Sequence, residues 1–478
     1  MNFYRQRFFH VLAFRLCCCF FSNTWFVPDE YFQSVEVAYH LVYGKGHLSW
    51  EWLPEWALRS PLHPLIYAFP FWLLKLFSVD FGFIIRWIPN IIHAFLFAIA
   101  DISLYIILPL YFTNWFIIYC STRTLSNTLE CCLILIALNF YTKEDANYVE
   151  TKKNDDSEEE KLAKFSIPKI DSFCICLIFV SIAAVIRPTT WLLWIPLCYG
   201  HFVFYLLEGL DVINQEITTK RMEKYILSGN ALFGSHPWHW YFTQGLPSIL
   251  LFSSIPLFTI LVKLIRSRYY VDIRLDRRYI LCAGLYIFSL SLIAHKEHRF
   301  VLPIIPILLP YIAVEINSYK NEFLKKWLIN LIIGSNLLAV IYFGLIHQRG
   351  PYVANNKIVQ YVDEKLQKDN SSTIYVLQLM PCFSMPMYAG LHPYAQNNTT
   401  DESEQFHSSP IPWLNKNWFS KKLYLTNLIV CYQHIFYKIE SFLMQKGFER
   451  HSLIFHTYFT SSSRQHSKII LLSKIEEE

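Results

Sequence analysis

The chain has little charge and little glycine for its length. Of its 478 residues, 17% are charged, 54% are hydrophobic and only 14 are glycine, whereas soluble domains carry roughly 25% charged residues. This composition excludes a disordered or fibrous chain and disfavours an ordinary soluble enzyme. Neither the G-x-x-x-x-G-K-[ST] nor the G-x-G-x-x-G pattern occurs in the sequence, so a nucleotide-binding P-loop or Rossmann core is not expected.

A long basic tract and a zinc-type cysteine pattern are also missing. The net charge of +5 is the difference between 42 basic and 37 acidic residues, and no basic run marks a nucleic-acid surface. No C-x-x-C pair has a histidine partner, and most of the 12 cysteines fall in apolar stretches, where a thiol packs as a small hydrophobe. We therefore expect no nucleic-acid partner, no metal and no other cofactor.

Long apolar runs are what the sequence does have. Residues 246–264, 300–316 and 327–346 are largely apolar and close to the roughly 20 residues that cross a bilayer as a helix. Further mainly apolar stretches bring the expected number of spans to about eight to eleven: 8–21, 62–77, 83–110, 131–140, 173–186, 191–207 and 279–294. The predicted fold class is an α-helical polytopic membrane protein.

Charges and glycosylation sequons predict the orientation. All three sequons, at Asn370, Asn397 and Asn398, follow the last apolar run, so their use would place that region in the lumen. Counting crossings backwards then puts the basic loops 266–278 and 318–326 in the cytosol, as the positive-inside rule requires. Loops 234–242 and 295–300 become lumenal. Arg5 and Arg7 before the first apolar run place the N-terminus in the cytosol, which makes loop 22–59 lumenal as well. A cleaved signal peptide is the alternative for the first apolar run, although Arg15 interrupts it.

The predicted organisation is a membrane domain, 1–349, followed by a lumenal C-terminal region, 350–478. The membrane domain contains a lumenal loop, 22–61, and a polar insert, 143–169, that reads as a solvated, disordered loop. The C-terminal region has strand-like segments at 372–380 and 422–426 and a helix-like segment at 357–368, which predicts a small α/β region. Its two cysteines, Cys382 and Cys431, could form a bridge in an oxidising lumen.

An acidic pair opens the first lumenal loop. Asp29 and Glu30 follow the first apolar run, where a substrate carried by lipid would meet water. Adjacent residues on a helix point about 100° apart, so only one of the two can face a given target. The plainer interpretation is a helix N-terminus with favourable acids. Trp50, Trp52 and Trp56 would likewise anchor the chain at the membrane interface.

A second charged segment, His295-Lys-Glu-His-Arg-Phe300, lies between two apolar runs. Charge at such depth is costly and tends to be functional. Arg299, Lys296 and His295 could bind a phosphate, Arg through its bidentate fork and Lys as a point charge. A snorkelling anchor is the alternative. His236 and His239 could ligate a metal, but no third ligand lies in sequence range, so we predict none.

Several motifs together resemble a known family, the dolichol-phosphate-mannose-dependent α1,2/α1,6-mannosyltransferases of the endoplasmic reticulum. The hexapeptide 295–300 is the strongest signal. The others are Val27-Pro-Asp-Glu-Tyr-Phe-Gln33, Trp50-Glu-Trp52, Leu58-Arg-Ser60 and Arg123-Thr-Leu-Ser-Asn127 with Glu130. Three further segments resemble the branch of this family that acts on the glycosylphosphatidylinositol (GPI) precursor: 234–245, 347–350 and 379–382.

The resemblance implies a fold and a set of substrates. It implies the GT-C glycosyltransferase fold, a lumenal active site in the endoplasmic reticulum membrane, and dolichyl phosphate mannose as the donor. The acceptor would be a GPI glycolipid intermediate, which would receive its third mannose in α1,2 linkage. Membrane lipids are the other expected partners.

The donor that this likeness implies is a β-linked mannosyl phosphate and the product an α-mannoside, so a single inverting displacement suffices. A carboxylate must then accept the proton of the acceptor hydroxyl, and we assign this role to Asp29, with Glu30 orienting either Asp29 or the acceptor. Arg299 and Lys296 would stabilise the leaving phosphate. The remaining residues expected to bind substrate are His295, Glu297, His236, His239, Arg59 and Trp52. This scheme requires no metal.

Two alternatives remain open at this point. A polytopic transporter or lipid scramblase would use embedded acids and bases as a relay instead of a catalytic pair. Within the family, a sibling enzyme could extend the lipid-linked oligosaccharide of N-glycosylation.

Overall fold

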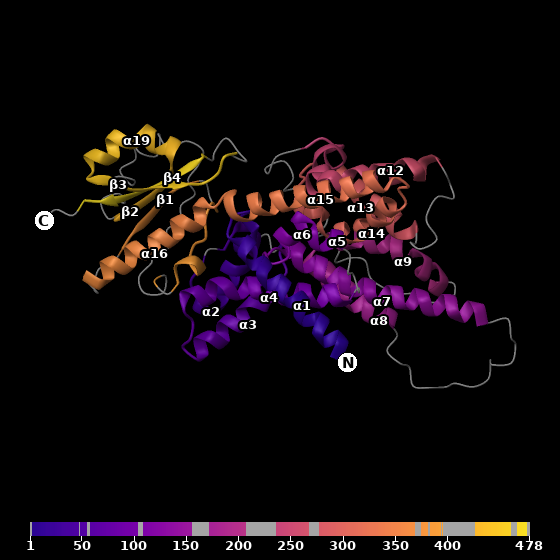
Figure 1. The fold of residues 1–478 in the computed structure, drawn as a ribbon. Helices are drawn as coiled ribbons and strands as arrows, with labels where there is room; N and C mark the ends of the chain where they lie inside the picture. Colours follow the sequence, from indigo (N-terminus) through magenta and orange to yellow (C-terminus); the bar gives the residue numbers. More distant parts are fainter. Residues whose placement is uncertain are drawn as a thin grey trace. The chain divides into compact units, whose positions relative to one another are not determined.

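The computed structural model describes most of the chain in two units (Figure 1). The described residues are 2–46, 48–54, 58–103, 109–154, 172–206, 236–266, 277–368, 374–380, 383–392, 394, 426–459 and 466–475. Unit 1 comprises residues 1–18, 58–60 and 92–339, and unit 2 comprises residues 19–57, 61–91 and 340–478. The predicted boundary at residue 349 refers to the membrane and stays a prediction.

Unit 1 is a bundle of helices. In chain order it contains α1 (Asn2–Cys18), the second half of α4 (Gly82–Ser103), α5 (Pro109–Thr113), α6 (Trp115–Cys120), α7 (Ser126–Asn154), α8 (Ser172–Ile186), η4 (Pro188–Thr190), α9 (Trp191–Leu206), η5 (Tyr241–Gly245), α11 (Leu246–Leu250), η6 (Leu251–Ser253), α12 (Ser254–Arg266), α13 (Arg277–Leu292), η7 (His298–Ile304), α14 (Ile305–Asn317) and most of α15 (Glu322–Ile341). The strongest packing is of α7 on α8 and on η7, and of α9 on α13.

Four helical stretches in the described part of the chain are long and apolar enough to cross a membrane. They are Gly82–Ser103, Tyr241–Arg266, His298–Asn317 and Glu322–Lys368, and the last three contain the three spans predicted from the sequence. Shorter apolar helices cover Leu62–Leu76, Ser172–Ile186 and Arg278–Leu292. A helix satisfies its own backbone hydrogen bonds, which lipid cannot do. These findings confirm a mostly helical membrane protein.

A buried ion pair joins α1 to α4 inside unit 1. Arg15 donates from Nε and Nη2 to the carboxylate of Asp101, at 2.7 and 3.1 Å, and Tyr111 donates to the same carboxylate at 2.6 Å. Both charged side chains are fully buried, and the guanidinium lies 4.7 Å from the ring centre of Phe97. This contact explains the charge that interrupts the first apolar run. It gives α1 a packing role that a cleaved signal peptide would not have.

Unit 2 combines the first loop with a small α/β region. Its helical segments are η1 (Cys19–Ser22), η2 (Tyr31–Val35), α2 (Glu36–Tyr43), η3 (Trp50–Trp52), α3 (Leu62–Leu76), the first half of α4, η8 (Tyr342–Ile346), α16 (Gly350–Lys368), η9 (Ala389–Leu391) and α19 (Gln433–Gln445). The carboxylate of Glu36 accepts the backbone N–H groups of Met387 and Ala389, both at 3.1 Å. This contact ties α2 to the segment before η9.

The C-terminal part of unit 2 is a four-stranded sheet. Its strands are β1 (Val376–Leu379), β2 (Leu428–Tyr432), β3 (Phe448–Phe455) and β4 (Lys468–Lys474), in the order β1-β2-β4-β3. β1 pairs parallel with β2, and the other two pairs are antiparallel. All five residues of β2 are buried, as a central strand covered on both faces requires. The small α/β region predicted from the sequence is confirmed.

One prediction from the sequence needs correction. The first twelve residues of the polar insert, 143–154, continue α7 instead of forming a loop, because Lys, Glu and Ala are good helix formers. The bridge between Cys382 and Cys431 stays a prediction, because Cys382 lies outside the described residues. Cys431 is buried in β2, where burial raises the pKa of its thiol to about 12.

Other predicted features lie outside the described residues. These are Trp56, Cys382, the sequons at Asn370, Asn397 and Asn398, the rest of the insert, and most of the predicted strand 422–426.

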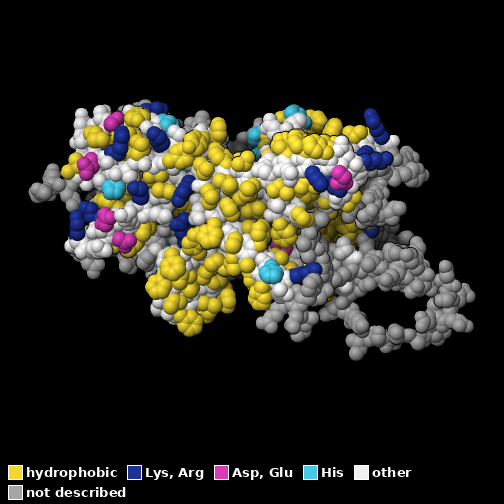
Figure 2. Space-filling model, in the orientation of Figure 1, with side chains coloured by type: hydrophobic (Ala, Val, Ile, Leu, Met, Phe, Trp, Pro, Cys, Tyr) yellow, Lys and Arg dark blue, Asp and Glu magenta, His cyan; other side chains and the backbone are white. Residues whose placement is uncertain are grey.

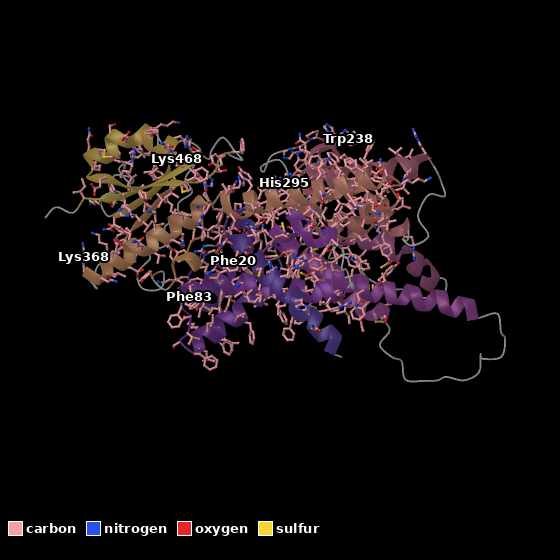
Figure 3. The ribbon with its side chains drawn as sticks, viewed as in Figure 1. Phe20, Phe83, Trp238, His295, Lys368 and Lys468 are labelled. Atoms are coloured by element: carbon pink, nitrogen blue, oxygen red, sulfur yellow. The ribbon has the colours of Figure 1, made fainter. Side chains whose placement is uncertain are left out.

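The surface differs between regions of unit 2. Hydrophobic side chains cover α3 and the start of α4, whereas Lys, Arg, Asp and Glu are concentrated over the C-terminal sheet region (Figure 2). Phe69, Phe77 and Phe83 are each more than 60% exposed, and Phe83 and Lys368 are labelled in Figure 3. Exposed aromatic area of this extent is typical of a surface that contacts lipid.

Candidate active site

The acidic pair of the first loop begins a helix in unit 2. The carbonyl of Pro28 accepts the backbone N–H groups of Tyr31 and Phe32, both at 3.0 Å, so the helical turn starts at Asp29. Asp29 is half-buried, whereas Glu30 is only 1% exposed. The two carboxylates therefore point apart, as expected for neighbours on a helix. Of the two, Asp29 is the one that a substrate could reach.

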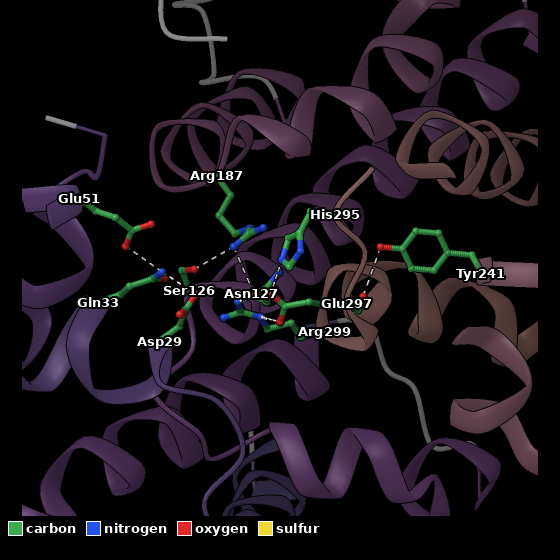
Figure 4. A network of polar contacts seen from close by, with 10 residues as sticks. All are labelled: Asp29, Gln33, Glu51, Ser126, Asn127, Arg187, Tyr241, His295, Glu297 and Arg299. Atoms are coloured by element: carbon green, nitrogen blue, oxygen red, sulfur yellow. Dashed lines mark hydrogen bonds and ion pairs between the residues drawn. The ribbon is translucent and has the colours of Figure 1, made fainter. Parts of the chain in front are cut away.

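Gln33 links Asp29 to a second acid of the same loop. Its amide Nε2 donates to Asp29 Oδ2 at 2.5 Å and to Glu51 Oε2 at 3.0 Å (Figure 4). Trp52 Nε1 donates to the carbonyl of Phe32 at 3.3 Å, which fixes η3 against η2. Neither Gln33 nor Glu51 had a predicted role. The contact of Gln33 with Asp29 could have been predicted, since residues i and i+4 meet on a helix, whereas no sequence spacing indicated Glu51.

The hexapeptide 295–300 forms a charged cluster in unit 1. Glu297 precedes η7 in an extended conformation and accepts from Arg299 through both oxygens, at 2.6 and 2.9 Å, in a bidentate pair. His295 Nε2 lies 2.8 Å from Glu297 Oε1. Burial raises the pKa of the Glu297 carboxyl, but Arg299 and His295 outweigh this and hold the pKa well below its usual range. Glu297 is therefore charged, and it fixes the guanidinium plane of Arg299.

Lys296 is held by neutral groups. Its ammonium Nζ donates to the backbone carbonyls of Ile293, at 2.5 Å, and His236, at 3.1 Å, and the side chain is buried. Tyr241 donates to the carbonyl of Glu297 at 3.3 Å. Because carbonyls orient an ammonium without neutralising it, the positive charge of Lys296 still acts on its surroundings.

A third set of polar residues, Ser126, Asn127, Glu130 and Arg187, lies in the same unit and carried no predicted role. Arg187 follows α8 in an extended conformation (φ −141°, ψ 107°), because the residue before a proline is pushed out of the helical region. Arg187 Nη1 donates to Ser126 Oγ at 3.1 Å and to Asn127 Oδ1 at 3.2 Å (Figure 4). Its Nε lies 3.1 Å from a carboxylate oxygen of Glu130.

Phe300 connects this set to the hexapeptide. The guanidinium carbon of Arg187 lies 5.3 Å from the ring centre of Phe300, and that of Arg299 lies 5.5 Å from it. The start of α7, the turn between α8 and α9 and the loop before η7 thus meet at one end of the unit 1 bundle. Arg187 had no predicted role because the sequence Arg187-Pro-Thr-Thr190 is typical of an ordinary helix break.

The remaining predicted site residues are His236, His239 and Arg59. The ring of His236 stacks on that of Trp240, with 5.0 Å between centres, and His239 Nδ1 lies 3.3 Å from Thr243 Oγ1; both histidines are exposed. Arg59 is half-buried and belongs to unit 1. In the described part of the chain, no group of three His, Cys, Asp or Glu side chains could hold a metal ion.

Apolar helices with clusters of acids and arginines at their ends define a class of protein: a multi-span membrane enzyme acting on a polar group at the membrane edge. The model of the Alg9-like mannosyltransferase family matches residues 6–213 and 226–392. The chain belongs to this family, and it is a mannosyltransferase.

Similar proteins of known name indicate a subgroup of this family. The chain is 31% identical to the GPI alpha-1,2-mannosyltransferase 3 of Bos taurus, over 95% of this chain and 86% of the relative. It is 30% identical to the protein of the same name from Homo sapiens, over 94% of this chain and 83% of the relative. The GPI mannosyltransferase 3 of Drosophila melanogaster is 29% identical, over 86% and 76%. No solved structure matches the chain.

Proposed function

We propose that the protein transfers the third mannose, in α1,2 linkage, from dolichyl phosphate mannose to the GPI anchor precursor. The observation that carries this proposal is the likeness to GPI alpha-1,2-mannosyltransferase 3 proteins over nearly the whole chain. The two acidic and cationic clusters support it, because they supply the two kinds of group that the reaction needs. The fold would then be of the GT-C type.

The attacking group is a hydroxyl of the acceptor mannose, and Asp29 is its general base. The carboxylate is half-buried and accepts from the amide of Gln33, which orients one of its oxygens for proton transfer. Glu51 accepts a hydrogen bond from the same amide and fixes the position of the Gln33 side chain. The buried Glu30 is a positioning residue in this proposal.

The leaving group is dolichyl phosphate, which needs positive charge more than a proton. Arg299 and Lys296 provide this charge. The bidentate contact with Glu297 fixes the guanidinium before substrate binds, so little reorganisation is needed during the reaction. The sugar inverts in one displacement: the acceptor oxygen forms the new C1–O bond while the C1–O bond to phosphate breaks, and the hydroxyl proton goes to Asp29.

The proposed location is the endoplasmic reticulum membrane with this site in the lumen. The positions of the sequons after the last apolar run, and of the basic loops 266–278 and 318–326, support that orientation. The reaction needs no metal in this scheme, since the dolichyl phosphate leaving group is already ionised and the protein supplies the cations.

Complementation tests the proposal directly. Cells that lack the third GPI mannosylation step should recover surface GPI-anchored proteins when they express the chain, and the two-mannose GPI intermediate should disappear from their lipid extract. If the GPI intermediate persists while truncated N-glycan precursors are extended instead, the protein is a sibling mannosyltransferase. If purified protein forms no glycosidic bond from labelled donor and either acceptor, the proposal fails.

A further inference from the structure

Two hydrogen-bond donors in the Ser126–Arg187 set have no acceptor among the described residues. Asn127 is fully buried, and its amide Nδ2 has no partner there. Arg187 donates from Nη1 to Ser126 and Asn127, whereas its buried Nε, 3.1 Å from a carboxylate oxygen of Glu130, has no hydrogen-bond partner among the described residues. A buried donor without an acceptor costs about 1–3 kcal/mol. Such a cost is commonly recovered when a ligand binds.

The orientation of the Asn127 amide is fixed by its neighbour. Its Oδ1 accepts from Arg187 Nη1 at 3.2 Å, and a flipped amide would put two N–H groups against each other. Nδ2 is thus the free end of the same side chain, next to the guanidinium. The two unsatisfied donors belong to residues in direct contact.

The surroundings favour an anion. Asn127 is the second residue of α7, a 29-residue helix whose N-terminal end carries partial positive charge. Arg187 carries one full charge and shares the ring of Phe300 with Arg299. Glu130 Oε1 accepts from Thr190 at 2.9 Å and from Thr189 at 3.2 Å, and Oε2 lies 3.1 Å from Arg187 Nε.

We propose that Arg187 and Asn127 bind a phosphodiester oxygen of a lipid-linked substrate. This inference rests on the proposed function, in which both substrates are lipid-linked: the donor is a dolichyl phosphodiester and the acceptor contains a phosphatidyl group. Arg187 supplies the positive charge, and Asn127 supplies the Nδ2–H donor. Phe300 places this pair next to Arg299, which makes the donor phosphate the expected ligand.

The ordinary alternative is a structural role, in which Arg187 only ties the α8–α9 turn to α7. Asn127→Asp separates the two roles. An aspartate keeps an oxygen for Arg187 Nη1 and adds a favourable charge at the start of α7, so a structural role predicts a variant at least as stable and active as the wild type. A role in binding predicts a loss of substrate affinity, because the N–H group that donates to the phosphate is replaced by an anionic oxygen that repels it.

The test is steady-state kinetics of the purified full-length protein in nanodiscs, with dolichyl phosphate mannose and a synthetic GPI acceptor varied separately. We expect Asn127→Asp and Arg187→Gln to raise the KM for one lipid substrate by about 10- to 100-fold, with the thermal stability of Asn127→Asp preserved. A rise in donor KM assigns the site to the donor phosphate, and a rise in acceptor KM assigns it to the phosphatidyl group.

A control variant completes the design. Arg266→Gln removes an exposed positive charge at the far end of the span Tyr241–Arg266 and should leave both KM values unchanged.

The outcomes separate this inference from the proposed function. If the wild type transfers no mannose, the proposed function fails. If the wild type is active and Asn127→Asp and Arg187→Gln leave both KM values within twofold of it, the phosphodiester site is refuted and the function stands.

Discussion

Several carboxylates in the two units differ in their close partners. In unit 1, Asp101, Glu130 and Glu297 each contact an arginine guanidinium, at 2.7, 3.1 and 2.6 Å. In unit 2, Glu36 accepts from backbone N–H groups and Asp29 accepts from the amide of Gln33. The first set of contacts consists of ion pairs, and the second set consists of hydrogen bonds from amide groups.

This difference indicates which acid can do chemistry. A guanidinium stabilises the charged form of its carboxylate. An acid such as Glu297 therefore stays deprotonated and orients an arginine. An amide donor orients a carboxylate without cancelling its charge. We therefore assign proton transfer to unit 2 and phosphate binding to unit 1.

The largest expected effect is on turnover through Asp29. Asp29→Asn keeps the size of the side chain but removes its basicity, so kcat should fall by roughly 10²–10⁴-fold. Glu30→Gln should cost less, because Glu30 is buried and points away. Initial rates of mannose transfer at saturating donor measure both. Equal losses in the two variants would leave the base unassigned, and wild-type turnover in Asp29→Asn would end the assignment.

The next effect is on stability, through the ion pair of unit 1. Arg15→Met should lower the free energy of unfolding by about 3–5 kcal/mol, because it leaves the buried Asp101 carboxylate without its guanidinium. The double variant Arg15→Met/Asp101→Leu should recover most of this loss, since an apolar pair needs no compensation. Thermal unfolding in detergent gives the comparison. A double variant no more stable than Arg15→Met would show that the charge itself is not the cause.

A smaller effect is expected for the affinity of the donor. Arg299→Ala removes the charge and the bidentate fork and should raise the donor KM by about 10- to 100-fold. Arg299→Lys keeps the charge but loses the fork, so its KM should lie between those of Arg299→Ala and the wild type. Kinetics with varied donor separates the three proteins. Identical KM values for Arg299→Ala and the wild type would remove Arg299 from the phosphate site.

The smallest effect concerns a neutral buried group in unit 2. His456 is fully buried, and neither ring nitrogen has a partner among the described residues; burial, with a contribution from His347, lowers its pKa to about 4. The neutral ring is therefore favoured in the folded protein, and the associated stability, up to about 3 kcal/mol, is complete above pH 6.5 and lost as the pH falls toward 4.

His456→Leu should flatten this dependence, whereas His451→Leu, at an exposed position of β3, should not. Unfolding temperatures between pH 7 and pH 4.5 decide between them. The same acid sensitivity in His456→Leu and the wild type would rule out this histidine as the cause.

Local patterns predicted the parts of the site that lie close together in sequence. The acidic pair and the hexapeptide were visible because charges stand next to apolar runs, and the divergence of Asp29 and Glu30 followed from helix geometry. Three predicted spans and the small α/β region were visible from hydrophobic period and length.

Contacts between distant segments were not predictable in this way. Arg187 meets Asn127 and Phe300 only because α7, α8 and η7 pack together, and Arg15 finds its partner 86 residues away. The extension of α7 to residue 154 has a different reason. The scarcity of apolar residues suggested a loop, but residues with good helix propensity continue the helix there.

Donor binding to the catalytically impaired variant tests the division of labour most directly. The account predicts that Asp29→Asn, which should hardly turn over, binds dolichyl phosphate mannose in nanodiscs with a Kd within about twofold of the wild type, while Arg299→Ala binds it at least about tenfold more weakly. A Kd weakened tenfold in Asp29→Asn but unchanged in Arg299→Ala would contradict it, because the carboxylate would then hold the donor and the arginine would not.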